Sequence, residues 1–177
     1  ITQQTDKLQL LIERLLLLAR LEQQQHLQTQ PLNLSILTAN IIEQKKAQCQ
    51  QSQLHLTHHL GNDVRVEGEA FWLEQAISNI LDNAIEFTPQ GKSITLNLTQ
   101  SPQQTTLMIN NQGQHIPDYA LPRIFERYYS LARPNSQYKS TGLGLTLVQE
   151  VMALHQGHVI IHNTDDGVSV TLVFFHH

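Results

Sequence analysis

The chain has 177 residues, with a hydrophobic fraction of 40% and a charged fraction of 15%, which suits one compact domain plus some extra secondary structure. Its net charge of -4 gives no positive footprint for nucleic acid, and its single cysteine, Cys49, excludes an internal disulfide and favours a reducing compartment. No apolar run reaches the roughly 18 residues that span a membrane. Because the sequence begins mid-pattern without methionine or signal peptide, we expect a larger parent protein, which could itself be membrane-bound.

Residues 6–22, DKLQLLIERLLLLARLE, predict a long helix because strong helix formers fill the segment and it lacks glycine and proline. Its leucines recur at the 3-4-3 spacing of a coiled-coil seam, and further apolar positions widen that surface. We therefore expect a helical bundle or a dimer contact, with packing on its own domain as the alternative. Residues 23–31 dilute the apolar signal and predict a hinge that closes at Pro31. The seam comprises Leu8, Leu11, Leu15 and Leu18, flanked by Ile12, Leu16 and Leu17.

The rest of the chain mixes helical and strand patterns without regular βαβ alternation, which favours an α+β fold with a mixed sheet and helices on one face. Helices are expected where apolar residues recur every three or four positions, and strands where they alternate. Helices are predicted at 35–51 (with Ser35 as a possible N-cap), 69–87, within 118–130, and 142–156, and strands at 53–60, 63–69, 93–110 (a hairpin), 158–163 and 168–175.

The ten histidines favour surface or capping roles over a metal site. Two groups stand out, one in a predicted strand and one around a helix end and the strand after it. Neither has an acidic or cysteine partner at ligand spacing, which leaves metal binding as the weaker alternative. The groups are His55, His58 and His59, and His155, His158 and His162.

In the segment NILDNAIEFTP, Asn79 and Asn83 lie four residues apart, so both amides project from one helix face. An asparagine carbonyl can bind a hard cation without adding charge, which suits an ion already bridged to phosphates. The alternative is that both amides bond to neighbouring backbone.

Two further segments predict a ligand site. In KSTGLGLTLVQ, Gly142 and Gly144 open a helix whose free N–H groups suit an anion, although a tight turn is the alternative. The loop INNQGQHIP, residues 109–117, follows an apolar run and contains a glycine, Gly113, where backbone comes close. That loop has no carboxylate.

With RIFERYYS between them, the order and spacing of these segments resemble the N, G1, F and G2 boxes of sensor histidine kinases, within the broader ATP-binding family of gyrase, Hsp90 and MutL-type proteins. NILDNAIEFTP and IPDYALPRIFERYYSL are most similar to the CreC type of sensor kinase. The resemblance implies a two-layer α/β sandwich of the Bergerat type over 29–177, preceded at 1–28 by a long helix from a helical-bundle dimerisation domain.

The resemblance also implies residue roles. Asn83 would bind Mg²⁺ that bridges the ATP phosphates, with Asn79 supporting it, and Phe87 would pack on adenine. Residues 128–141 would form the ATP lid. The implied nucleotide-binding set is Asn79, Asn83, Phe87, Asn111, Gly113, His115, Ile116, Arg127, Thr141, Gly142, Leu143, Gly144 and Leu145, with Arg133 and Lys139 as further cationic candidates that could equally be surface charges.

Three positions depart from the family pattern, and all predict weaker ATP binding. Asn111 stands where the family carries an aspartate that accepts from the adenine amino group, so a charge-assisted bond becomes neutral, a loss of about 1 kcal/mol. His115 matches the second glycine of the loop. Glu86 stands where a lysine is frequent and adds negative charge near polyphosphate.

The resemblance implies a cytoplasmic part of a two-component sensor kinase, whose parent is anchored in the inner membrane and forms a homodimer through residues 6–22. It would bind Mg-ATP, phosphorylate a histidine outside this chain and pass the phosphoryl group to a response-regulator aspartate. No histidine here has the family's acceptor context. The alternative is a degenerate interaction domain with weak or no ATP binding. A water-activating ATPase is less favoured, because Asn79 replaces the glutamate base of those relatives.

Overall fold

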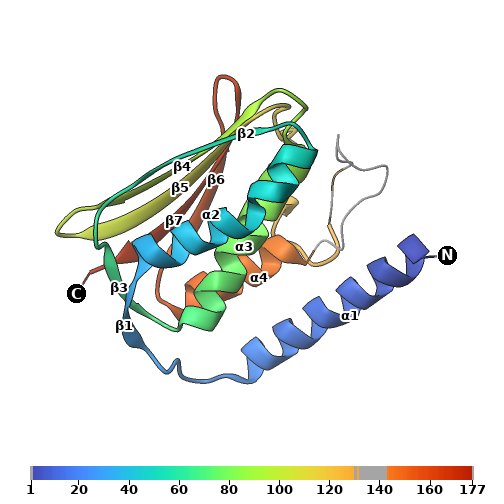
Figure 1. Cartoon of the computed structure of the whole chain (residues 1–177). Coiled ribbons are helices and arrows are strands. Elements are labelled where there is room, and N and C mark those ends of the chain that lie inside the picture. Colours follow the sequence, from blue (N-terminus) through green and yellow to red (C-terminus); the bar gives the residue numbers. More distant parts are fainter. Residues whose placement is uncertain (1, 130, 132–142, 177) are drawn as a thin grey trace.

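The computed structural model describes residues 2–129, 131 and 143–176. The elements alternate irregularly between helices and strands, as the sequence patterns predicted (Figure 1). In chain order they are α1 (Thr2–Gln23), β1 (Gln30–Asn33), α2 (Leu34–Gln51), β2 (His55–Leu60), β3 (Arg65–Gly68), α3 (Ala70–Phe87), β4 (Ser93–Gln100), β5 (Gln104–Gln112), the 3-10 turn η1 (Leu121–Arg123), α4 (Gly144–Leu154), β6 (His158–Asn163) and β7 (Gly167–Phe175).

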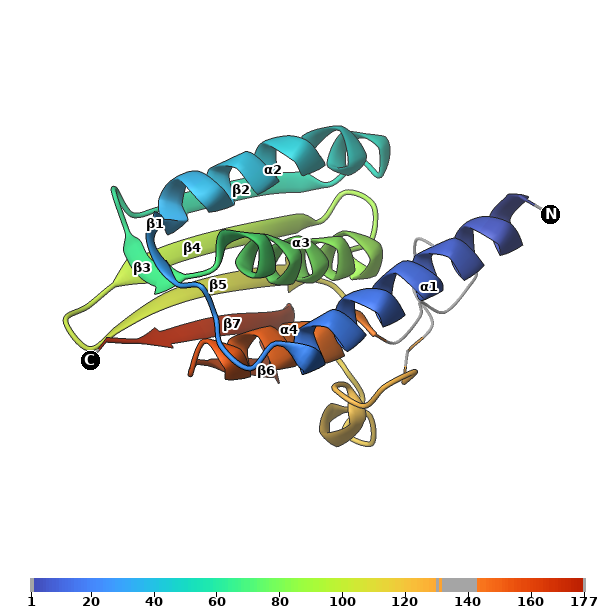
Figure 2. The ribbon, with the colours of Figure 1, turned by 90° about the horizontal axis from the view of Figure 1, so that it is seen from below.

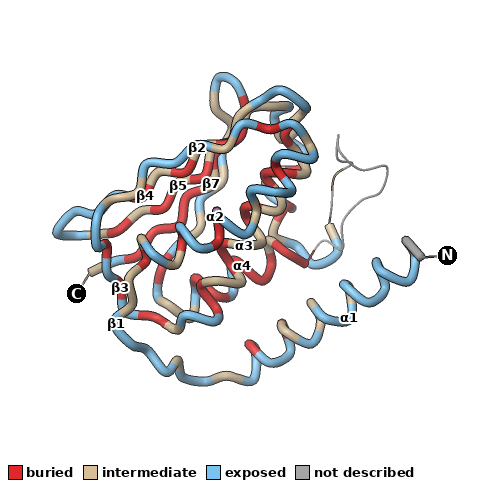
Figure 3. The backbone as a smooth tube through the Cα atoms, in the orientation of Figure 1, coloured by how far each residue is buried: buried red, intermediate tan, exposed pale blue. Residues whose placement is uncertain are grey.

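A five-stranded sheet in the order β2-β4-β5-β7-β6 forms one layer, and β1 and β3 pair separately. Only β2 and β4 run parallel within that sheet, while the other neighbours are antiparallel. Helices α2, α3 and α4 cover one face (Figure 1). The buried side chains concentrate between these helices and the sheet (Figure 3). The predicted two-layer fold with a mixed sheet is confirmed.

Helix α3 lies at the centre of the helical layer and contacts α2, α4 and β5. Its apolar residues recur every three or four positions, so a single stripe faces the sheet, and Trp72 is fully buried. The helix ends where Thr88 donates its hydroxyl to the carbonyl of Ala84 and Pro89 follows. The end predicted at residue 87 is therefore confirmed.

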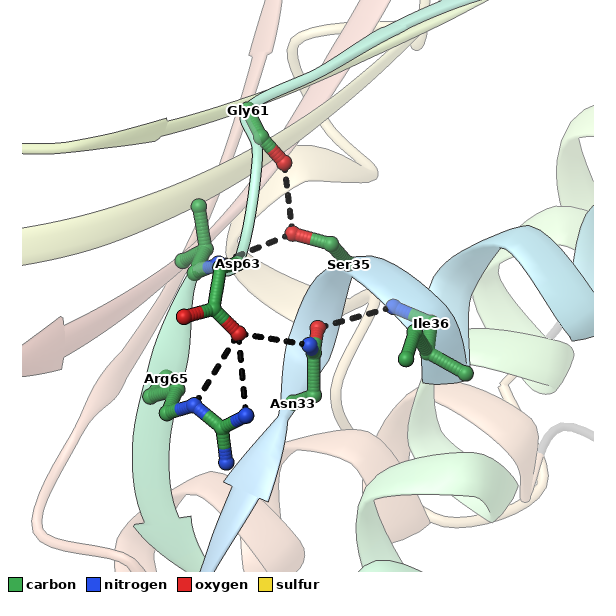
Figure 4. A network of polar contacts seen from close by, with 7 residues as sticks. Asn33, Ser35, Ile36, Gly61, Asp63 and Arg65 are labelled. Carbon is green, nitrogen blue, oxygen red and sulfur yellow. Dashed lines mark hydrogen bonds and ion pairs between the residues drawn. The ribbon is translucent and has the colours of Figure 1, made fainter.

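The start of α2 differs from the prediction, because Asn33 and not Ser35 caps the helix (Figure 4). The Asn33 side-chain oxygen accepts from the amide of Ile36 at 3.0 Å, and its Nδ2 donates to Asp63 at 2.9 Å. The same Asp63 oxygen accepts from Arg65. The cap is therefore joined to the turn before β3 by side-chain hydrogen bonds.

Ser35 has a different role, linking α2 to the loop between β2 and β3 (Figure 4). Its hydroxyl donates to the carbonyl of Gly61 at 2.6 Å and accepts from the amide of Val64 at 3.0 Å. Local sequence cannot separate two neighbouring cap formers when the deciding partner is 29 residues away. Two other predictions also differ from the structure. Strand β1 begins at the end of the predicted hinge, and the described part of 118–130 contains a 3-10 turn in place of the predicted helix.

Helix α1 lies beside α4 (Figure 2), and part of the predicted leucine seam packs on its own domain. Leu18 and Leu21 are buried in the core, and Leu11 and Leu15 pack against it. A second apolar stripe remains open, with exposed fractions of 58% for Leu8, 49% for Ile12 and 65% for Leu16. The alternative, packing on its own domain, therefore holds for one face of the helix. In the described chain no helix is long and apolar enough to cross a bilayer.

Polar contacts fix the end of α1 to the start of α3. Trp72 donates its indole N–H to the side-chain oxygen of Gln24 at 2.8 Å, and Gln24 donates in turn to Glu69 at 2.8 Å. The guanidinium of Arg20 lies 5.0 Å from the centre of the Phe71 ring.

The predicted boundary between two domains at residues 28 and 29 stays a prediction.

His155, just after α4, joins that helix to the start of α3. Its Nδ1 lies 2.8 Å from the carbonyl of Val151, which can only accept, so Nδ1 carries the hydrogen. Its Nε2 then accepts from the backbone amide of Glu69 at 3.1 Å. Burial lowers the pKa of His155, and the bond to Val151 and the charge of Glu69 only partly oppose this.

A neutral His155 predicts a fold that weakens in mild acid. Its folded pKa lies below the unfolded value of about 6.5, so its contribution is complete above that pH and declines as pH falls through the folded pKa. We expect His155→Gln to lower the free energy of unfolding by about 1–2 kcal/mol at pH 8 and to flatten its fall towards pH 5. Urea unfolding at both pH values measures this, with exposed His59→Gln as the control. An equally steep fall in His155→Gln would contradict the assignment.

Candidate functional site

A cavity of about 300 Å³ opens between α3, the helix-covered face of β5 and β7, the loop after β5 and the start of α4. Its wall is mostly apolar because β5 and β7 present alternate residues to this face. A concave apolar site with a few polar groups is the usual form of a small-molecule site. The apolar wall includes Ile80, Ala84, Ile109, Val168 and Val170.

Asn83 lines the cavity and Asn79 does not. Both lie on α3, one turn apart, but the Nδ2 of Asn79 is buried with no hydrogen-bond partner in the described structure. Magnesium is commonly bound by one or two protein oxygens together with substrate phosphates, so the Asn83 carbonyl oxygen fits that ion. Within the described residues, no three histidine, cysteine or acidic side chains gather as a metal site.

The start of α4 faces the same space. Gly144 is its first residue and Leu143 its N-cap, with Leu143 fully buried and Gly144 in the cavity wall. A Cβ added to Gly144 would lie 3.9 Å from the Nδ2 of Asn83, so a side chain here would project towards that amide. The N–H groups and dipole of the first turn of a helix suit an anion.

Asn111 lies near the end of β5 and lines the cavity, and it is 8% exposed. Its Nδ2 makes only a long contact, 3.5 Å, with the carbonyl of Gln112. Such a buried amide can offer either a donor or an acceptor to a ligand. An aspartate at this position would offer only acceptors when ionised.

Gly113 does not line the cavity, and the close backbone approach expected there is with the end of α3. Its φ is +151°, and an added Cβ would lie 3.0 Å from both the Phe87 carbonyl and Pro89. Its amide donates to the carbonyl of Asp166 at 2.9 Å. The glycine therefore closes the turn after β5, and contact with a ligand stays a prediction.

Asn163 of β6 orders the loop after β5, a role that the sequence did not reveal. It accepts from the amide of Ile116 at 2.8 Å and donates to the carbonyl of the same residue at 2.9 Å. Ile116 and His115 thereby line the cavity, with Phe87 and Leu145. Thr146 donates to the carbonyl of Phe125 at 2.8 Å and joins α4 to the segment that follows η1.

The structure places the remaining predicted residues in two groups. Arg127 lies outside the cavity wall and forms an ion pair with Glu22 of α1. Thr141, Gly142, Arg133 and Lys139 lie outside the described residues. Sequence reasoning also missed several wall positions in the loop after β5 and in and around the segment that resembles the F box. These are Gln114, Pro117, Tyr119, Ile124, Tyr129 and Leu131.

Comparison with known proteins agrees with this geometry. Residues 68–176 match the family described as histidine kinase-, DNA gyrase B-, and HSP90-like ATPase. The sensor protein CreC of Escherichia coli (strain K12) is 42% identical over 164 residues, which cover 93% of this chain and 34% of CreC. The chain thus spans about a third of that relative's length.

Solved histidine kinases share the fold. The Acinetobacter baumannii histidine kinase AdeS aligns with a TM-score of 0.80 at 21% identity, covering 98% of this chain and 81% of that one. ThkA, solved in complex with the response regulator TrrA, aligns with a TM-score of 0.80 at 19% identity, covering 98% and 48%.

The family match covers most of the chain, and it contains α3, β5 and α4, which build the cavity. The resemblance inferred from the sequence motifs is therefore confirmed. The chain belongs to the histidine kinase-, DNA gyrase B-, and HSP90-like ATPase family, and over 93% of its length it is similar to the sensor protein CreC.

Proposed function

We propose that this chain binds Mg-ATP in the cavity and acts as the ATP-binding part of a two-component sensor histidine kinase. One observation carries the proposal: Asn83 and the start of α4 border the same cavity whose apolar wall reaches Asn111. A nucleotide needs both halves, an apolar slot for the base and a polar end for the phosphates.

The residues divide the task by chemistry. The apolar wall, with Phe87, holds the adenine, and Asn111 offers its amide to the base edge. The first-turn N–H groups at Gly144 bind phosphate oxygens, and Asn83 contributes an amide oxygen to Mg²⁺. The bound ion supplies charge neutralisation at the phosphates. Since the chain holds no acceptor histidine in the family context, its own residues position the nucleotide and exclude water.

The parent protein would then transfer the γ-phosphoryl group to a histidine outside this chain and pass it to a response-regulator aspartate. The regulator partner is supported by the fold shared with ThkA, which was solved with a response regulator. We place the domain in the cytoplasm, with the parent anchored in the inner membrane.

A second candidate function rests on the same cavity. Asn111 and His115 both line it, so the two departures from the family pattern meet the ligand directly. A neutral amide and an imidazole side chain there would weaken nucleotide binding, and the domain would then serve as a degenerate interaction module in its parent.

Calorimetric titration with Mg-ATP separates these functions. We expect the wild-type chain to bind, and Asn83→Ala to weaken binding at least tenfold with Mg²⁺ but far less in excess EDTA, because its role is to hold the ion. We expect Asn111→Asp to tighten binding by roughly three- to tenfold, since a neutral hydrogen bond becomes charge-assisted.

The control is Asn97→Ala, on the opposite face of the sheet from the buried residues of β4, which should bind as the wild type does. Binding by Asn111→Asp alone would establish the degenerate interaction module. If no variant binds Mg-ATP, the cavity is not the nucleotide site.

We also propose a homodimer through the open stripe of α1, the exposed face formed by Leu8, Ile12 and Leu16. These residues recur every four positions and face away from the domain core, while the buried leucines occupy the other side of the helix. Exposed stripes of this kind mark contact surfaces. A second copy of the helix presents the same stripe, so one symmetric contact would bury the exposed apolar side chains of both chains.

Introducing a charge on the open stripe should break that contact. We expect Ile12→Glu to weaken self-association by at least tenfold, because a carboxylate is costly to bury. Sedimentation velocity across a concentration series measures it. The matched control is Leu10→Glu, the same change at an exposed leucine on another face of the helix. Equal effects of both variants would exclude the stripe as the interface.

A further inference from the structure

Arg14 of α1 approaches Gly144, a residue of the cavity wall at the start of α4. A Cβ added to Gly144 would lie 3.9 Å from the Nη1 of Arg14 and 3.9 Å from the Nδ2 of Asn83, so both groups approach the same point. The three residues come from three different helices, and Arg14 is 130 positions from Gly144 in sequence. A cation from α1 thus borders the position to which we assign the phosphates.

Arg14 is partly buried and lies next to two acidic side chains of α3. Burial lowers the pKa of Arg14, while Asp82 and Glu86 on the adjoining face of α3 raise it. Asp82 is also paired with Lys45 of α2 at 2.8 Å. Two acidic and two basic side chains therefore surround the end of α3, and only Arg14 among the basic ones also approaches Gly144.

Independent contacts fix α1 in this position. Leu18 and Leu21 are buried in the core, and Gln24 bonds to both Trp72 and Glu69. Glu22 pairs with Arg127 in the segment that borders the cavity. Arg14 lies between these ties and the open end of the helix, so its placement follows from the docking of the whole helix.

We propose that Arg14 is a phosphate-binding residue that α1 supplies to the nucleotide site. This inference rests on the proposed function and extends it, since the site would be complete only when α1 is docked. A guanidinium presents several N–H donors in a planar fork and matches phosphate oxygens well. It also offsets Asp82 and Glu86, which would otherwise repel a polyphosphate approaching the end of α3.

If Arg14 binds the phosphates, nucleotide binding and the docking of α1 strengthen each other. If a docked α1 strengthens phosphate binding, bound nucleotide must favour the docked helix by the same factor. Movement of α1 would then alter affinity for the nucleotide without any change in the cavity wall. The opposite possibility is that Arg14 competes with the cation and phosphates for this space.

The experiment compares Mg-ATP with adenosine on the whole chain, by calorimetry at low and moderate salt. Arg14→Gln removes the charge, and Arg14→Lys retains it. The matched control is Arg20→Gln, since Arg20 also lies on α1 but packs on Phe71 and Trp72, away from the cavity. Thermal unfolding of each variant checks that the fold persists.

We expect Arg14→Gln to weaken Mg-ATP binding by about tenfold and to leave adenosine binding unchanged, because only the phosphates lose a partner. Arg14→Lys should recover part of the loss, and Arg20→Gln should match the wild type. A merely structural role would weaken both ligands together, which would overturn the proposal. So would unchanged or tighter Mg-ATP binding in Arg14→Gln, the latter identifying Arg14 as a competitor. If the wild type itself binds no Mg-ATP, the proposed function fails first and this inference falls with it.

Discussion

The burial of one face of α3 on the sheet is the constraint on which the site depends. Trp72 and the apolar residues that follow it every three or four positions leave the helix only one rotation about its axis. That rotation brings Asn83 to the edge of the buried stripe, where the cavity opens, and directs Asp82 and Glu86 towards α1. The position of the polar end of the site is thus a consequence of core packing, and a change in that packing would move the amide.

Much of this arrangement could be predicted from the sequence, because periodicity reports directly on burial. The stripe of α3 and the alternation of β4 and β5 appear in local patterns. That Asn83 and the glycine-led helix share one site was implied only by the family resemblance. The choice between Asn33 and Ser35 as the cap of α2 could not be predicted, since Asp63, Gly61 and Val64 decide it from across the fold. The roles of Asn163 and Arg14 were hidden for the same reason. A single polar residue within a helix or strand carries no local signal of a partner 47 or more positions away.

Helix α1 shows how one apolar segment can serve two surfaces. The leucine seam suggested a single partner, yet the residues divide between a face on the domain core and an open face. A helix with two apolar stripes couples a partner bound to its open face with the part of the domain that its closed face contacts. Here Arg14 approaches Gly144 at the start of α4, and Glu22 pairs with Arg127 in the segment that borders the cavity. A shift of α1 would therefore alter the surroundings of the cavity directly, without any change in the sheet.

The bond between Gly113 and Asp166 closes the base of a long excursion that begins after β5 and returns at β7. The two strands pair along their whole length, from Gln104 with Phe175 to Gln112 with Gly167, so the ends of the excursion are held at adjacent positions. Loop closure depends only weakly on loop length once its ends are fixed. That excursion includes α4, whose Val148 and Val151 are buried in the core, and β6, which pairs with β7. Tolerance of substitutions and of changes in length is therefore expected only in the connection between β5 and α4. The fold can diversify its ligand chemistry in that segment while the register of β5 and β7 stays the same.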